Sequence, residues 1–334
     1  MIETNRCPHG SQKVSSAAMR ERAFFDRAAE LFSTLQSEIC AGLEDLDGVG
    51  RFTTDDWSRS GGGGGLSRVL TGGRLFERAG VNWSKVEGEL PAEYAAQIPG
   101  QGTSFSAAGV SLVLHPGSPM VPTVHANFRY LSKGDRAWFG GGADLTPYYL
   151  FREDAVHFHR TWQRACAAHP GAADYRRFKE WCDEYFFISH RGERRGVGGI
   201  FFDYLDGAGI DGGLEAVLAF TSEAGRAFLP AYRPIAERRA GESYGERERQ
   251  WQLLRRGRYV EFNLVYDRGT VFGLKTGGRT ESVLMSLPPL CRWEYDPGDP
   301  PAGSREAELV AVLRNPVDWL GSSGSGEASP DHQG

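Results

Sequence analysis

The apolar positions near the start of the chain repeat with the period of an amphipathic helix. Between residues 17 and 46 they fall on one stripe, and Gly48 and Gly50 follow it, so we predict a helix that ends there. A strand-like piece at 51–57 comes next. From there to about residue 91 the pattern predicts short extended pieces that alternate with glycine turns.

The middle of the chain alternates with the period of two that is typical of strands. Turn residues separate three such segments, and we predict strands at 105–115, 122–131 and 136–143. Helical spacing returns in later segments, which are 153–168, 173–189, 213–239, 246–256 and 304–313. A short apolar run at 200–205 lies between them. Residues 258–267 and 270–275 are β-branched and aromatic, and we interpret them as a hairpin that turns at Asp267, Arg268 and Gly269.

This order of elements predicts an α+β fold. Strands cluster first, helices second and strands again third, without the repeated βαβ units of a parallel sheet. We therefore expect a single domain, residues 17–320, built on a large antiparallel β-sheet with helices packed on it. Residues 1–16 are predicted to be a flexible N-terminus. The low-complexity segment 321–334, GSSGSGEASPDHQG, is predicted to be a disordered tail.

Composition narrows the class of protein. The 334 residues are 40% hydrophobic and 24% charged, with a net charge of −5, so we expect a globular protein that does not bind nucleic acid. No run approaches the roughly 20 apolar residues of a membrane span, and the first 16 residues contain no apolar core of a secretory signal. Five scattered cysteines without paired spacing argue against disulfides or structural zinc. A cytoplasmic location is the prediction that fits best.

The most informative segment is TVHANFRYL, residues 123–131. In a strand, His125, Asn127 and Arg129 share one face, and an apolar set that includes Phe128 shares the other. Alternating polar residues by themselves are more typical of a solvent-exposed face. However, histidine, asparagine and arginine are groups that handle ligands. The preceding strand presents Ser111 and His115 in the same way, so we expect one polar patch on one face of the sheet.

A lone carboxylate, Asp144, follows the glycines at 140–142. One interpretation makes it the cap of a turn through Thr146 and Pro147. The other makes it a buried anion that recognises N–H donors.

Glycines also flank two arginines, Arg195 and Arg279, and with Arg129 these are three candidate carboxylate clamps because a guanidinium binds a carboxylate with two parallel hydrogen bonds. Tyr259, Glu261 and Asn263, placed on one face of the predicted strand, are candidates for further polar contacts. These residues indicate a carboxylate-rich small-molecule ligand without specifying a reaction.

Six long blocks, in order along residues 20–319, resemble the oxygen-dependent coproporphyrinogen III oxidase family. They are SRVLTGGRLFERAGVN, GVSLVLHPGSPMVPTVHANFRYL, WFGGGADLTPYYL, EDAVHFHRTW, FKEWCDEYFFISHRGERRGVGGIFFDYL and GRYVEFNLVYDRGTVFGLKTGGRTESVLMSLPPLCRWEY. The resemblance implies an antiparallel sheet with helices on both faces, and a homodimer formed through about residues 259–294. It also implies the oxidative decarboxylation of two propionates of coproporphyrinogen III with O2 as co-substrate and no organic cofactor.

The resemblance also assigns roles to individual residues. It implies that His125 is a proton donor and that Asp144 is a carboxylate suited to the pyrrole N–H groups. The implied substrate contacts are Ser111, Asn127, Phe128, Arg129, Arg195, Gly277, Gly278 and Arg279. Tyr204 stands where a second acid is expected after Asp203, and it receives no role.

A divalent metal is a further possibility, because bacterial relatives are sometimes assigned one through four histidines, here His115, His125, His159 and His190. Four polar histidines around an anionic ligand are equally expected without a metal. Two other classes remain as alternatives: a metal-dependent oxygenase and a non-catalytic tetrapyrrole carrier. The chain contains no CxxxCxxC motif for the radical enzyme that performs the same step without oxygen.

Overall fold

The computed structural model describes residues 16–275 and 278–321, so the predictions for residues 1–15, Gly277 and 322–334 lie outside the described residues. In the described part, seven strands form one antiparallel sheet in the order β1-β2-β3-β4-β5-β6-β9. The strands are β1 (Thr53–Ser58), β2 (Gly63–Thr71), β3 (Phe76–Glu89), β4 (Ser104–Pro116), β5 (Thr123–Lys133), β6 (Arg136–Thr146) and β9 (Gly199–Leu205). Two short strands, β7 (Phe187–Ile188) and β8 (Glu193–Arg194), pair separately.

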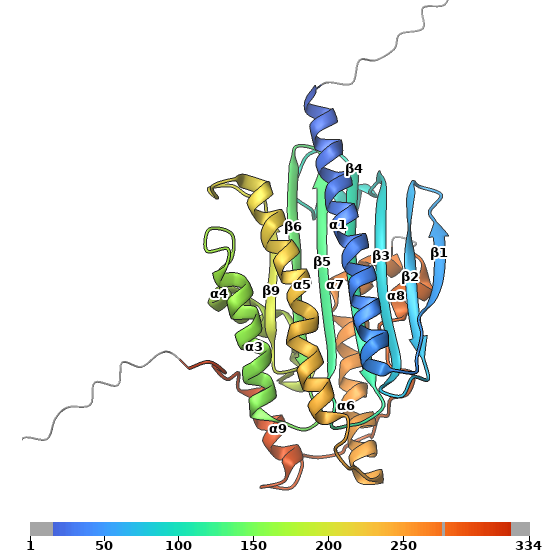
Figure 1. Cartoon of the computed structure of the whole chain (residues 1–334), viewed down its shortest axis with the longest axis vertical. Helices are drawn as coiled ribbons and strands as arrows, with labels where there is room; N and C mark the ends of the chain where they lie inside the picture. Colours follow the sequence, from blue (N-terminus) through green and yellow to red (C-terminus); the bar gives the residue numbers. More distant parts are fainter. Residues whose placement is uncertain (1–15, 276–277, 322–334) are drawn as a thin grey trace, which may run out of the picture.

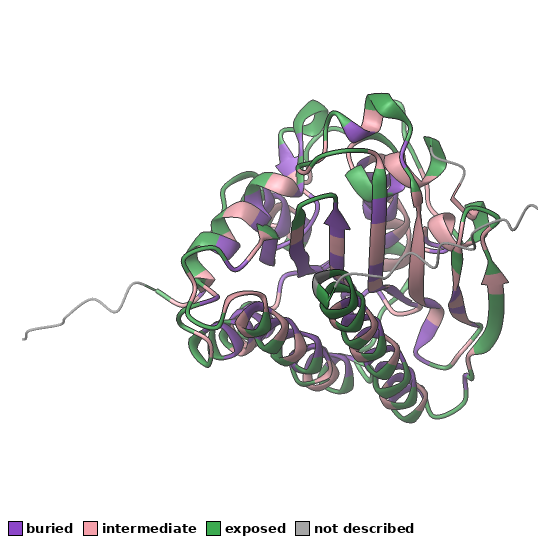
Figure 2. Cartoon of the chain, turned by 90° about the horizontal axis from the view of Figure 1, so that it is seen from above, coloured by how far each residue is buried: buried purple, intermediate pink, exposed green. Residues whose placement is uncertain are grey.

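Helices cover both faces of this sheet, as the α+β prediction requires (Figures 1 and 2). Those in front of the sheet in Figure 1 are α1 (Ser16–Asp47), α3 (Arg152–Ala167) and α5 (Gly213–Arg239). Those behind it are α6 (Glu246–Val265), α7 (Arg268–Lys275) and α8 (Thr280–Leu284). The remaining helices are α2 (Ala92–Ala95), α4 (Tyr175–Tyr185) and α9 (Arg305–Arg314), with a 3₁₀ turn at Ser189–Arg191. None of the described helices is long and apolar enough to cross a membrane.

The main core lies between the sheet and the helices α1 and α5. Side chains from the centre of the sheet, such as Leu112, Ala126 and Phe128, are fully or almost fully buried there. The predicted stripe of α1 supplies Phe25, Phe32 and others to the same cluster. Because strand side chains alternate, burying these positions turns Ser111, His125, Asn127 and Arg129 to the opposite face, which we call the site face.

The predicted hairpin at 258–275 is wrong. Helix α6 runs on to Val265, and α7 occupies Arg268–Lys275. The aromatic and β-branched residues of YVEFNLVY have high strand propensity, but tertiary packing overrides it. The buried positions of α6 recur three and four residues apart, as at Tyr259, Phe262 and Asn263, which is the spacing of a helix face.

Two smaller differences concern element lengths. The helix predicted at 173–189 ends at Tyr185, where the chain enters β7 and the 3₁₀ turn. The segment from 63 to 89 forms two long paired strands, β2 and β3, rather than short pieces, because cross-strand pairing extends over nine residues through the glycines 63–65. The strands predicted at 105–115, 122–131 and 136–143 are confirmed with slightly longer bounds.

Candidate active site

Polar side chains form rows across the site face, because the strand register places them side by side. In one row Asn82, Ser111 and Asn127 are consecutive partners on β3, β4 and β5, and Gly142 of β6 completes it. The next row contains His125 opposite Asp144. The row on the other side contains Arg129 opposite Gly140. Ser111, His125, Asn127 and Arg129 of the predicted polar patch are therefore confirmed on a shared face. His115, its fifth member, lies on the same side of β4 but is fully buried.

His125 is held by Asp144. Its Nδ1 lies 2.9 Å from Asp144 Oδ1, and 21% of the histidine side chain is exposed, whereas 1% of the aspartate is. Because an ionised carboxylate can only accept hydrogen bonds, Nδ1 carries a proton and donates to Asp144, which leaves the Nε2 atom at the other end of the ring outside this contact. Nε2 is thus the atom of His125 that can exchange a proton with a substrate.

Arg195 binds the same carboxylate from the other side. Its Nε and Nη2 donate to Asp144 Oδ2 and Oδ1 at 3.1 and 2.6 Å, and its Nη1 donates to Asn263 Oδ1 at 2.7 Å. The guanidinium is enclosed by the aromatic rings of Phe186, Tyr259 and Phe262, with ring centroids 4.1, 4.6 and 4.8 Å from Cζ. These contacts hold the planar guanidinium in the orientation in which it binds the Asp144 carboxylate with two hydrogen bonds.

The electrostatics of this pair keep Asp144 charged. Burial would raise the pKa of its carboxyl, but the Arg195 guanidinium and His125 outweigh burial and leave the pKa below its ordinary value. For Arg195, burial opposes the positive charge, yet the Asp144 carboxylate raises the pKa above its ordinary value. The two charges form a buried ion pair beneath the exposed edge of His125.

Arg129 lies two rows away from His125 along β5 and is more accessible, with 34% of its side chain exposed. It donates to Asn127 Oδ1 at 3.0 Å through Nη1 and to Asp203 Oδ2 at 2.7 Å through Nη2. Arg268, at the start of α7, approaches the same Asp203 oxygen to 3.8 Å. Two guanidinium groups share one carboxylate here, which leaves net positive charge on the site face.

The third predicted clamp, Arg279, lies at the far edge of the sheet. It forms ion pairs with Asp55 of β1 and, at 3.5 Å, with Glu281. Asp55 lies opposite Ser67, which begins the row that continues through Asn82 to Ser111. Gly278 precedes Arg279 directly. The three arginines therefore occupy the site-face side of the sheet, but each lies at a different place on it.

The predicted contact through Phe128 does not fit the structure. Its side chain is fully buried in the main core on the opposite face, between its register partners Val110 and Gly141. Strand alternation forces this placement once Asn127 and Arg129 face the site. The side chain of Phe128 thus supports the sheet rather than a ligand on the site face.

The four histidines do not gather into a metal site. His115 Nε2 donates to the Ser286 carbonyl oxygen at 2.9 Å, and its Nδ1 lies 3.2 Å from Thr123 Oγ1. His159 bridges Tyr175 and the Val197 carbonyl in a similar way.

His190 lies against Tyr266 and Glu261, each at 2.7 Å. Within residues 16–275 and 278–321, no three histidine, cysteine, aspartate or glutamate side chains are grouped closely enough to hold a metal ion. The residues that the structure places therefore do not fit the four-histidine metal site.

Burial explains the state of two of these rings. It lowers the pKa of His115 to about 3, with a further contribution from the nearby Arg256 charge, and it lowers the pKa of His159 to about 4. Both imidazoles are neutral at pH 7, and both serve as internal hydrogen-bonding groups.

Three residues around the site were not predicted in their observed roles. Asn263 was predicted to share a strand face with Tyr259 and Glu261. In helix α6 it shares a face with Tyr259, four residues earlier. Glu261 instead contacts His190, Arg191 and Trp293 at the surface. Asp203 and Arg268 were not singled out. Helical spacing through 252–263 is the signal that would have found Asn263; for Asp203 the sequence carries no comparable signal.

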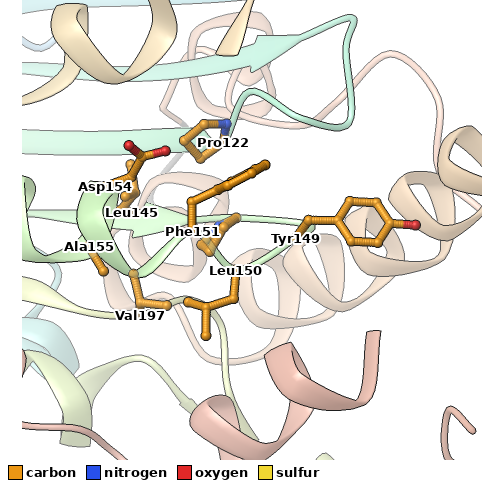
Figure 3. Close-up of a pocket in the computed structure, with 9 residues that line it drawn as sticks. Pro122, Leu145, Tyr149, Leu150, Phe151, Asp154, Ala155 and Val197 are labelled. Atoms are coloured by element: carbon orange, nitrogen blue, oxygen red, sulfur yellow. The ribbon is translucent and has the colours of Figure 1, made fainter. Parts of the chain in front are cut away.

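A small pocket lies away from this site, on the core side of the sheet beside α3 (Figure 3). Its lining is largely apolar and includes Pro122, Leu145, Leu150, Ala155 and Val197. Leu145 faces the main core, whereas its neighbour Asp144 faces the site. The pocket therefore lies on the opposite side of the sheet from the site face.

A sheet face that presents arginines beside a buried histidine–aspartate–arginine chain is typical of a protein that binds and transforms an anionic small molecule. Comparison with known proteins identifies the family. A family model described as coproporphyrinogen III oxidase matches residues 27–319. The chain belongs to the coproporphyrinogen III oxidase family.

Curated relatives agree with this assignment, and each carries the name oxygen-dependent coproporphyrinogen-III oxidase. The protein from Parasynechococcus marenigrum (strain WH8102) is 55% identical over 321 residues, which cover 89% of this chain and 88% of that protein. The protein from Synechococcus sp. (strain CC9902) is 53% identical, with 92% and 91% covered. The protein from Prochlorococcus marinus (strain MIT 9313) is 51% identical, with 92% and 94% covered.

Proposed function

We propose that this protein is an oxygen-dependent coproporphyrinogen III oxidase of haem and porphyrin biosynthesis. It converts the propionates of rings A and B of coproporphyrinogen III to vinyl groups and releases protoporphyrinogen IX. The observation that carries the proposal is the His125–Asp144–Arg195 chain, which lies on a face with further arginines in a chain at least half identical to relatives of that name.

The chemistry balances with O2 as the acceptor. Each propionate loses CO2 and one hydrogen from its β-carbon, and the electron pair of the broken C–CO2 bond forms the vinyl double bond. The electron pair of the broken C–H bond reduces O2, which takes up the hydrogen lost from the β-carbon, as a proton, and one further proton and leaves as hydrogen peroxide. A porphyrinogen pyrrole is electron-rich and can itself pass electrons to oxygen, so the proposal needs no organic cofactor. The protein then supplies position, proton transfer and charge stabilisation.

In this proposal His125 moves the proton at Nε2, and Arg129 and Arg279 hold carboxylates. Arg195, which was expected to contact a propionate, is 2% exposed and donates through its three nitrogens to Asp144 and Asn263, so it supports Asp144 instead. Ser111 and Asn127 add neutral hydrogen-bonding groups to the middle of the surface. The role proposed here for Asp144 differs from the contact with pyrrole N–H groups that the family resemblance implies. Because it is 1% exposed and both of its oxygens bind His125 or Arg195, it positions those two groups.

We also propose that the protein is a homodimer and works in the cytoplasm. In the region expected to pair, 259–294, Tyr259, Val260 and Phe262 are buried within the chain and are unavailable. Exposed apolar residues remain in that stretch for an interface, namely Leu264, Val265, Leu274, Leu290 and Trp293. Light scattering after size exclusion tests this: a mass of twice 36.7 kDa is expected, and a monomer over the working concentration range contradicts it.

Product analysis tests the proposed activity. Coproporphyrinogen III is incubated in air with the wild-type protein, and the products are oxidised and analysed by mass spectrometry. Stepwise loss of two carboxyl groups, abolished by heat denaturation, is expected. Binding of the substrate without loss of carboxyl groups contradicts the proposal and favours a tetrapyrrole carrier.

A further inference from the structure

Strands β6 and β9 lose their one-to-one register beside Arg129. Gly141 pairs with Phe202 and Phe139 pairs with Leu205, so Asp203 and Tyr204 together face the single residue Gly140. This is a β-bulge, a feature that re-aims side chains next to functional sites. In a regular strand the side chains of residues 203 and 204 would point to opposite faces.

The bulge keeps both side chains on the site-face side. Asp203 reaches Arg129, and the Tyr204 ring packs on Trp138, with ring centroids 5.6 Å apart. Leu205 then returns to register opposite Phe139 and packs against the main core. The extra residue thus adds a group to the site face without disturbing the core face.

Tyr204 has an unusual backbone that the bulge requires. Its φ is 54°, and among the described residues it is the one non-glycine residue with a positive φ. This conformation is unfavourable for a residue with a β-carbon, so the surrounding structure must impose it. In it, the Tyr204 N–H donates to Oδ1 of Asp203 at 3.0 Å.

The two oxygens of Asp203 are therefore divided between two tasks. Oδ1 is tied to the bulge, and Oδ2 accepts from Arg129 at 2.7 Å. Gly140 makes room for this pair, because a β-carbon at that position would lie 2.5 Å from Asp203 Oδ1 and 2.9 Å from Arg129 Cζ. The bulge, Gly140 and the Asp203 carboxylate therefore together determine the position of the Arg129 guanidinium.

We propose that Asp203, fixed by the left-handed backbone of Tyr204, is a positioning residue that orients Arg129 toward a substrate propionate. The inference rests on the proposed function, since it takes a carboxylate of the substrate as the ligand of Arg129. Asp203 is approached by two guanidinium groups, those of Arg129 and Arg268, so its single negative charge leaves one positive charge unpaired in this group of three. A carboxylate of the substrate would pair with that remaining charge.

The test compares Asp203→Asn with Asp206→Asn. Asp206 is a matched control, because it lies three residues further on and forms a surface ion pair with Arg136 at 2.6 Å. For each variant we would measure KM and kcat with coproporphyrinogen III. We would also measure, by fluorescence, the preference for coproporphyrin III, which has four carboxylates, over mesoporphyrin IX, which has two.

Asp203→Asn is expected to raise KM about tenfold or more, to change kcat less, and to reduce the preference for four carboxylates by a similar factor, because a misplaced guanidinium loses its paired hydrogen bonds. Asp206→Asn should match the wild type. The inference is overturned if the two variants behave alike, or if KM rises while the carboxylate preference stays at the wild-type ratio.

A second pair of variants keeps the test independent of how Asp203→Asn folds. Asparagine tolerates a left-handed backbone and valine does not, and both remove the tyrosine ring. Tyr204→Val should therefore show a weaker carboxylate preference than Tyr204→Asn, and equal preferences would overturn the role of the backbone. The porphyrin measurements decide the inference even if the wild type forms no product, an outcome that would instead refute the proposed function.

Discussion

Asp144 and His125 lie directly opposite each other on β6 and β5, and their side chains meet 2.9 Å apart. A cross-strand pair of this kind is held by the sheet itself, so the imidazole is oriented before any substrate arrives. Arg195, which lies 51 residues after Asp144 in the chain and outside the seven-stranded sheet, donates to the same carboxylate. The side chains of the site are therefore already ordered in the folded protein, so most of their conformational entropy is lost on folding and not on substrate binding.

Replacing Asp144 by asparagine should remove the charge that orients His125. We expect kcat to fall by about 100-fold or more, because the correct tautomer of the ring is no longer enforced, and we expect KM to change less. Arg195 would become a buried charge without its ion-pair partner, so the free energy of unfolding should fall by about 3 kcal/mol. Steady-state kinetics and urea unfolding measure the two effects.

Asp299→Asn is the control for this substitution, since it breaks a carboxylate–arginine pair with Arg314 at the surface. It should leave both measurements at their wild-type values. If Asp144→Asn kept full turnover, Asp144 would have no part in the reaction.

The buried histidines predict how stability depends on pH. The pKa of His159 is lowered to about 4 in the folded protein, while the unfolded chain protonates near 6.5. Between these values the unfolded state binds more protons, so stability is lost as the pH falls from about 6.5 to 4, with a slope of up to about 1.4 kcal/mol per pH unit for this group. His115 acts in the same direction, down to about pH 3.

Urea unfolding at pH 7 and pH 5 tests this with His159→Gln. The glutamine variant is expected to be less stable at pH 7 and to lose less stability on acidification than the wild type. His157→Gln is the control, because His157 lies on the same helix with its side chain far less buried. A wild-type pH dependence in His159→Gln would show that His159 is not the titrating group.

Gly140→Ala should impair substrate binding more than folding. The added β-carbon would meet Asp203 Oδ1 and Arg129 Cζ, which are the ends of side chains that can shift, so the fold should survive. The Arg129–Asp203 pair would be displaced, and we expect KM to rise about tenfold with the melting temperature changed by a few degrees at most. Gly171→Ala, where nothing lies within 4 Å, is the control. An unchanged KM for Gly140→Ala would mean that the pair has no role in binding.

The sequence predicted the site face well where strand alternation determined it. The period of two in TVHANFRYL placed His125, Asn127 and Arg129 together, and the structure places Ser111 beside Asn127 as expected. The same alternation should have removed Phe128 from the set of substrate contacts. Phe128 was predicted to contact the substrate because its segment resembles a family motif. A motif does not distinguish a side chain that touches a ligand from one that packs behind the strand.

Other parts of the site depend on contacts that a sequence does not reveal. The register of β5 against β6, which pairs His125 with Asp144, and the approach of Arg195 follow from the whole fold. The segment 258–265 was predicted as a strand because its residues are aromatic and β-branched, although its burial follows helical spacing. The bulge at Asp203 and Tyr204 has no glycine to mark it, so the sequence alone gave no reason to expect it.

A single-turnover experiment with and without oxygen tests the proposed oxygen-dependent reaction most directly. Protein treated with EDTA is mixed anaerobically with coproporphyrinogen III and then exposed to air, and protoporphyrin is followed by fluorescence after oxidation. Product is expected after exposure to air alone, at a rate that EDTA does not reduce. Product that returns only when a divalent metal is added back, or product formed without air, would contradict this expectation.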